Sequence, residues 1–89
     1  DAVDYLKTEQ DCAEYLSVVL EDGDPTLLAA ALGDVARARG MSQVARDSGL
    51  TREGLYKALS TQGNPSFATV MKVMHAMGLQ ISVQPVAHA

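Results

Sequence analysis

The chain has 89 residues, a formal net charge of −4 and 47% apolar residues, enough for one small core and not for two. No stretch approaches the roughly 18 consecutive apolar residues of a membrane span, and the first residues lack the basic start and apolar run of a signal peptide. Cys12 is the single cysteine, so an internal disulfide is excluded. The composition predicts one cytoplasmic domain without a membrane partner.

The acidic balance is uneven along the chain. Residues 1–34 carry nine acidic side chains and one basic one, a net charge of −8, whereas residues 35–89 carry six basic and two acidic ones, a net charge of +4. A basic surface attracts phosphates, and an acidic surface attracts a cationic partner. The pattern indicates two binding surfaces of opposite charge, with a merely solvated acidic face as the simpler alternative.

Two helices are predicted in the acidic part. The first begins after a cap at Thr8 and ends at Gly23, as the helical spacing of its apolar residues indicates. These residues are Cys12, Leu16 and Val19. Asp24-Pro25 is a typical cap and first-turn pair for a second helix, which should run to about Arg39 and end at Gly40.

The next segment has the pattern of a helix-turn-helix. Ser42 is the expected cap of a short helix over 43–48, and Thr51 that of a helix over 52–60, with Gly49 in the turn between them. Such helices cross closely, so small and apolar residues are needed where they touch. Those positions hold Val44, Ala45, Leu50, Leu55 and Leu59. The polar face of the second helix carries an arginine near its start, which suits base reading in the major groove.

A fifth helix and a strand complete the prediction. Ser66 should cap the helix, which closes at Gly78. Its expected core stripe is Phe67, Val70, Met71, Met74 and Met77. After it the apolar period changes to two, in Leu79, Ile81 and Val83, and ends at Pro85. Because a solitary strand has no ladder partner, we expect it to pair antiparallel with the same strand of a second copy, forming a homodimer.

Three segments carry a resemblance to a known family. They are Met41–Ser60, Gly63–Val70 and the Met77–Leu79 ending. They resemble the Xre/Cro-type addiction-module antidote proteins, a HigA-like branch of bacterial antitoxins. The N-terminal part of the chain resembles this family too, over Asp4–Leu6, Asp22–Pro25 and Ala30–Arg37. The resemblance implies an all-α, five-helix fold like the λ-repressor DNA-binding domain, to which the sequence adds one short C-terminal β-strand for dimerisation.

The expected organisation has four parts. An acidic helical pair over 1–40 belongs to the same domain as the helix-turn-helix and supporting helix over 41–78. The dimerisation strand occupies 79–85, and 86–89 form a tail.

The resemblance implies a homodimeric repressor of its own operon, bound to an inverted-repeat operator in double-stranded DNA, and a small basic, RelE-like toxin as partner. It assigns base reading to Thr51, Arg52, Glu53, Tyr56 and Lys57, and phosphate contacts to Gln43, Arg46, Asn64 and Ser66. Gln43 and Ser66 also lie at predicted helix N-termini, where phosphates are favoured. The family usually has serine at the position of Gly54. Glycine there lowers the helix propensity of the segment.

The acidic front is expected to meet the toxin. The residues concerned are Glu9, Asp11, Glu14, Glu21 and Asp22. The alternatives are a stand-alone regulator similar to a phage repressor, and an interaction module that has lost DNA binding, which the acidic net charge favours. An enzyme is not expected, since the sequence offers no Ser/His/Asp or Cys/His set, no metal-ligand cluster and no phosphate-binding glycine loop. No cofactor or metal is expected, and His75 lacks companions at metal-ligand spacing.

Overall fold

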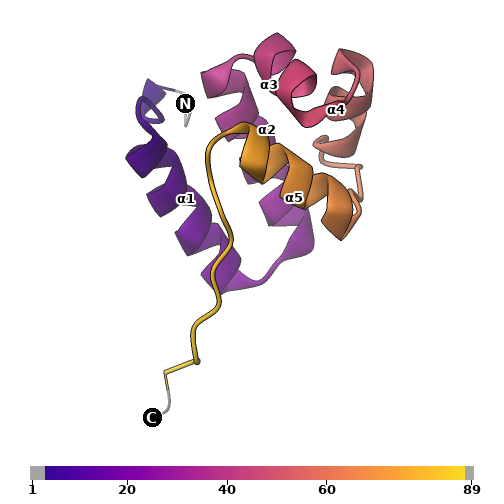
Figure 1. Ribbon diagram of the computed structural model, residues 1–89. Helices are drawn as coiled ribbons and strands as arrows, with labels where there is room; N and C mark the ends of the chain where they lie inside the picture. Colours follow the sequence, from indigo (N-terminus) through magenta and orange to yellow (C-terminus); the bar gives the residue numbers. More distant parts are fainter. Residues whose placement is uncertain (1–3, 88–89) are drawn as a thin grey trace.

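Five helices dominate the computed structural model, which describes residues 4–87 (Figure 1). They are α1 (Glu9–Asp22), α2 (Pro25–Arg39), α3 (Met41–Ser48), α4 (Arg52–Ala58) and α5 (Phe67–Ala76). The all-helical class and the number of helices agree with the prediction. None of the helices within residues 4–87 has the length and apolarity that crossing a membrane requires.

The first two helices form an antiparallel hairpin. Thr8 caps α1 in a capping box with Asp11, and Gly23 ends it in the left-handed conformation, with φ of 79°. Asp24 then accepts hydrogen bonds from the first turn of α2. Two contacts at matched distances from this turn hold the helices together: Tyr15 Oη donates to Asp34 Oδ2 over 2.8 Å, and Arg39 pairs with Glu9 over 3.4 Å. Both predicted helices are thereby confirmed.

The start of α3 differs from the prediction. Ser42 was expected as its cap, but the helix begins at Met41, directly after Gly40, and has no side-chain cap. Gly40 ends α2 and starts α3 with φ of 103°, a value that suits glycine. The Met41 side chain is buried in the core, so packing replaces the missing cap.

The turn into α4 follows the predicted chemistry. Gly49 ends α3 with φ of 76°, and Thr51 Oγ1 caps α4 by accepting from Gly54 N over 2.9 Å. The last regular residue of α4 is Ala58, two residues before the expected end, and Leu59 is its C-cap. A tight turn between two short helices therefore presents α4 beside α3.

One core joins the hairpin to the remaining helices. It contains Leu6, Cys12, Leu16, Val19, Ala31, Leu32, Val35, Ala36, Met41, Val44, Ala45, Leu55, Leu59, Val70, Val73, Met74 and Met77. The prediction that Phe67 lies in the core is wrong, because 70% of this residue is exposed. It is the first residue of α5, where the helix has only just met the core, and Val73 takes the buried place instead.

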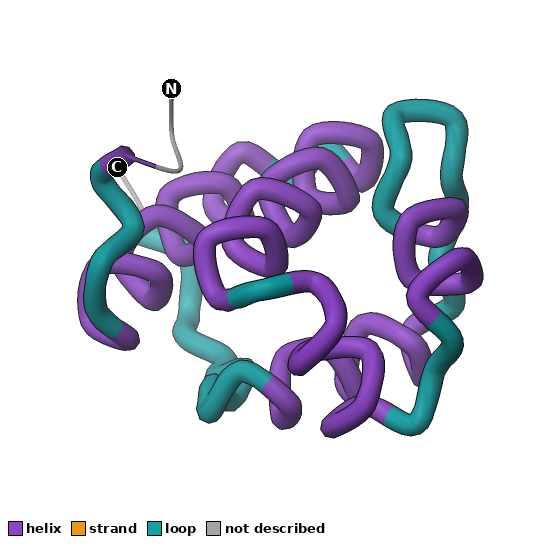
Figure 2. The backbone as a smooth tube through the Cα atoms, turned by 90° about the horizontal axis from the view of Figure 1, so that it is seen from above, coloured by secondary structure: helices purple, strands orange, loops and turns teal. Residues whose placement is uncertain are grey.

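The predicted C-terminal strand is absent from the described residues, which are helices, turns and loops (Figure 2). Leu79 N donates to Met74 O, but within residues 4–87 the backbone of 80–87 makes no hydrogen bond. A ladder needs a second strand, and the described part of the chain offers none. The segment instead runs beside α1 (Figure 1), with Leu79 and Ile81 packed on the core and Val83 94% exposed. Residues 88–89 of the predicted tail lie outside the described range.

Candidate nucleic-acid interface

The outer face of α4 carries four of the five residues to which base reading was assigned. Arg52, Glu53, Tyr56 and Lys57 are all exposed. Leu55 and Leu59, on the opposite face, are buried in the core and fix the orientation of the helix. Thr51 is exposed as well, but its hydroxyl is engaged in capping α4. The helix thus turns one cationic and aromatic face to solvent.

Arg52 and Tyr56 form a unit on that face. The Arg52 guanidinium carbon lies 5.4 Å from the centre of the Tyr56 ring, and Arg52 Nη2 lies 3.4 Å from Tyr56 Oη. A cation held over an aromatic face keeps its charge and loses rotamer freedom. The guanidinium is accordingly held along the outer face of α4, with donors left for a further acceptor.

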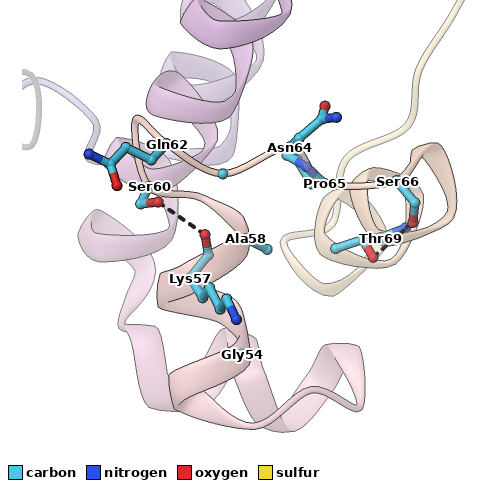
Figure 3. Close-up of a pocket in the computed structure, with 10 residues that line it drawn as sticks. Gly54, Lys57, Ala58, Ser60, Gln62, Asn64, Pro65, Ser66 and Thr69 are labelled. Carbon is cyan, nitrogen blue, oxygen red and sulfur yellow. Dashed lines mark hydrogen bonds between the residues drawn. The ribbon is translucent and has the colours of Figure 1, made fainter.

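A hollow of about 500 Å³ lies between α4 and the N-terminus of α5 (Figure 3). It is lined by Gly54, Lys57, Ala58, Ser60, Gln62, Gly63, Asn64, Pro65, Ser66 and Thr69. Three predicted site residues, Lys57, Asn64 and Ser66, are thus brought together from two helices and the loop between them. One wall is the start of α5, where unpaired backbone N–H groups and the helix dipole favour an anion.

Thr69 is a lining residue that the sequence prediction missed. Ser66 Oγ accepts from Thr69 N and donates to Thr69 Oγ1, each over 3.1 Å. A threonine three residues after a serine cap is a local signal that could have indicated this pair. The two hydroxyls form one polar edge of the hollow.

The other two residues with predicted phosphate contacts lie elsewhere. Arg46 Nη1 donates to Gln43 Oε1 over 3.2 Å, and Gln43 Nε2 donates to both Asp47 carboxylate oxygens over 2.9 Å. All three are exposed on α3, and none lines the hollow. They form a separate polar strip in which Asp47 partly offsets the charge of Arg46.

Gly54 shapes both α4 and the hollow. A Cβ atom at this position would lie 2.9 Å from Thr51 Oγ1, the atom that caps the helix. A larger residue would therefore crowd the cap or displace it. The absent side chain also leaves the hollow open on the α4 side.

Gly33 determines how closely α4 approaches α2. It is a buried glycine in the middle of α2, and a Cβ atom there would lie 3.1 Å from the Leu59 carbonyl oxygen at the end of α4. Glycine inside a helix is unfavourable by about 1 kcal/mol relative to alanine. Its presence is explained by this close backbone approach.

The acidic residues of the hairpin have different roles in the structure. Glu9 pairs with Arg39, Asp11 completes the capping box of α1, and Asp24 caps α2. Glu14 accepts from Gln10 Nε2 on the surface of α1. Glu21 and Asp22 are exposed, and neither side chain has a partner among the described residues. Fewer acidic side chains of α1 and α2 are therefore free to bind another molecule than the composition indicates.

Two side chains of α1 have shifted pKa values. Burial raises the pKa of the Tyr15 hydroxyl, and the adjacent Asp34 carboxylate raises it further. Burial also raises the pKa of the Cys12 thiol, which stays protonated and unreactive in the core. Residues 4–87 contain no group of three or more His, Cys, Asp or Glu side chains placed to hold a metal ion.

Comparison with known proteins identifies one matching family and one similar protein. A family model described as "Probable addiction module antidote protein" matches residues 1–85. An uncharacterised protein of Haemophilus influenzae (strain ATCC 51907 / DSM 11121 / KW20 / Rd) is 56% identical over 84 residues, which cover 94% of this chain and 87% of that protein. No solved structure matches the chain significantly.

Proposed function

The chain belongs to the family of probable addiction module antidote proteins, and we propose that it neutralises a toxin and also represses transcription of its own module by binding DNA. An antidote implies a toxin as partner. The finer parts of the proposal are operator binding, a homodimer, and a small basic toxin of the RelE-like class, with no catalytic activity in this chain itself.

The face of α4 beside the hollow carries the argument for DNA binding. An exposed arginine and an exposed lysine, five residues apart on this helix, adjoin an N-terminal helix end lined by hydroxyl and amide groups. Arginine on an exposed helix suits bidentate bonds to guanine, and a helix N-terminus suits a backbone phosphate. In this proposal Arg52, Glu53, Tyr56 and Lys57 read bases, while Asn64 and Ser66 hold a phosphate.

The C-terminal segment supports a dimer. Its backbone from 80 to 87 has no hydrogen-bond partner within the described chain. An isologous pair of such segments would supply each other's partners. We infer antiparallel pairing through 79–83 of two copies, with two α4 helices presented to an inverted repeat.

A stand-alone regulator without a toxin is the second candidate, because the α4 face would serve it equally well. Membership in an antidote family favours the antitoxin.

DNA binding is tested with Arg52→Ala on the operator region upstream of the module. We expect a loss of about 1–3 kcal/mol of binding free energy and a relaxed preference at one base pair per half-site. Wild-type affinity should fall steeply between low and physiological salt. The matched control is Lys72→Ala, an exposed cation on α5 away from the hollow.

Two outcomes would contradict parts of this proposal. Equal weakening of all sequences by Arg52→Ala would make Arg52 a phosphate contact and not a base reader. Absence of wild-type binding even at low salt would remove DNA from the function, while leaving the antitoxin role to be judged on complex formation with the toxin.

A further inference from the structure

The most exposed apolar side chain of α1 is surrounded by acidic residues. Val18 is 67% exposed, and in a helix its neighbours on the surface are the residues three and four positions away. Those residues are Glu14, Tyr15, Glu21 and Asp22. Three of the four carry negative charge, and all three are exposed. The arrangement is one apolar contact point inside an anionic ring.

A second exposed apolar side chain lies on the same side of the hairpin. Leu27, 44% exposed, is seven residues before Asp34 and so shares a stripe of α2 with it. Asp34 bonds to Tyr15, which is itself a neighbour of Val18 on α1. Val18 and Leu27 therefore flank the same seam between α1 and α2. We call Val18, Leu27, Glu14, Glu21 and Asp22 the hairpin patch.

No cation in this region neutralises the patch. Residues 9–34, which contain all of α1 and two thirds of α2, include no lysine or arginine. The two nearby cations of α2 are engaged: Arg37 with Asp34, and Arg39 with Glu9. Glu21 and Asp22 have no side-chain partner among the described residues, so their charge is available to another molecule.

We infer that the hairpin patch is the surface on which this antidote holds its toxin, through a toxin segment that places lysine or arginine side chains around an apolar residue. This inference rests on the proposed function. A second copy of the chain is a poor occupant, because two identical anionic patches repel each other. An apolar centre with a charged rim also matches the usual anatomy of a protein interface.

The charge and the apolar centre make separable contributions. Opposite charges act mainly on the rate of association, and a buried apolar contact acts mainly on dissociation. Glu14→Lys combined with Asp22→Lys should slow association with the toxin by about tenfold at low salt and flatten its salt dependence. Val18→Ser should leave association nearly unchanged and speed dissociation by about tenfold.

The experiment measures binding kinetics of the full chain with the purified small protein encoded next to its gene. Asp47→Lys combined with Ser42→Lys and Ala68→Lys makes the same change in net charge on exposed residues of α3 and α5, and Phe67→Ser removes an exposed apolar side chain at the start of α5. These controls should keep wild-type kinetics with the toxin. Circular dichroism should show that all variants retain their helices, since every substituted residue is exposed.

The possible failures are distinguishable. If the wild-type chain forms no complex with that protein, the proposed antitoxin function and this inference fall together. If a complex forms and the patch variants bind like wild type, only the inference is overturned. Equal losses in the patch and control variants would also overturn it, since the effect would then follow net charge and not position.

Discussion

Tyr15 links the two helices of the hairpin by a single polar contact. Its hydroxyl donates to Asp34 Oδ2, and the same carboxylate pairs with Arg37. All buried side-chain polar atoms within residues 4–87 have a hydrogen-bond partner, so this network is satisfied as it stands. A bond of this kind contributes about 1 kcal/mol to stability when both groups are in the correct protonation state.

The raised pKa of Tyr15 gives this contact a pH dependence. The folded state holds the hydroxyl neutral, so the contribution is complete below the ordinary tyrosine pKa of about 10 and is lost as the pH rises through the folded value. We expect the unfolding free energy of the wild type to fall above pH 10. Tyr15→Phe should be less stable at pH 8 and should show a weaker decline at high pH.

Chemical denaturation between pH 8 and pH 11 measures both effects. Tyr56→Phe is the control, because its hydroxyl lies on the outer face of α4. It should leave the unfolding free energy at pH 8 nearly unchanged. Parallel curves for wild type and Tyr15→Phe would show that the hydroxyl does not titrate differently in the folded state.

At the scale of elements, the position of α4 depends on a glycine in another helix. A methyl group at Gly33 would crowd the Leu59 carbonyl oxygen, which must then shift by a few tenths of an ångström. Gly33→Ala raises helix propensity in α2 by about 1 kcal/mol, yet it should tilt the end of α4. We therefore expect a lower ratio of operator to random-DNA affinity, by about tenfold, with the melting temperature little changed.

Competition binding between operator and random DNA measures this ratio directly. Ala68→Val adds volume at an exposed position of α5 and should leave the ratio unchanged. A Gly33→Ala protein that is more stable and equally specific would mean that the interface between α2 and α4 absorbs the methyl group.

The helices were predictable because their signals are local. Thr8, Asp24, Thr51 and Ser66 cap helices as their sequence contexts indicate. The start of α3 was not predictable from local signals, since burial of Met41 outweighs the capping preference of Ser42. The prediction that Phe67 is buried was wrong for a related reason. Helical spacing predicts which residues form the apolar stripe of α5, but only packing shows which of them contact the core.

The candidate site was predictable in part. The exposed face of α4 follows from the apolar positions behind it, whereas the separation of Gln43 and Arg46 from the hollow depends on how α3 and α5 pack. The roles of the acidic residues depend on contacts between helices, such as that of Glu9 with Arg39, 30 positions apart. Charge counting along a chain contains no information on such contacts.

At the scale of the whole molecule, the proposed dimer assigns the contact with a second chain to the C-terminal segment. Val83→Pro removes a backbone donor at an exposed position without disturbing the core, in contrast to Ile81, which packs on it. We expect a helical protein that sediments as a monomer and loses most of its affinity for an inverted repeat, while weak half-site binding remains.

Val86→Pro, three residues further on and beyond the expected pairing region, is the control and should remain a dimer. A Val83→Pro protein that still sediments as a dimer would place the contact between copies elsewhere, and the exposed start of α5 around Phe67 would be the next surface to test.

The hairpin and the other three helices share a single core, in which Cys12 and Leu16 of α1 belong to the same cluster as Leu55 of α4 and Met77. Deletion of α1 would open that cluster to water, so a fragment starting at Pro25 would not remain folded. In the proposed function, an allele shortened from the front would consequently be recessive: its product would neither hold the toxin nor compete with intact copies for the operator.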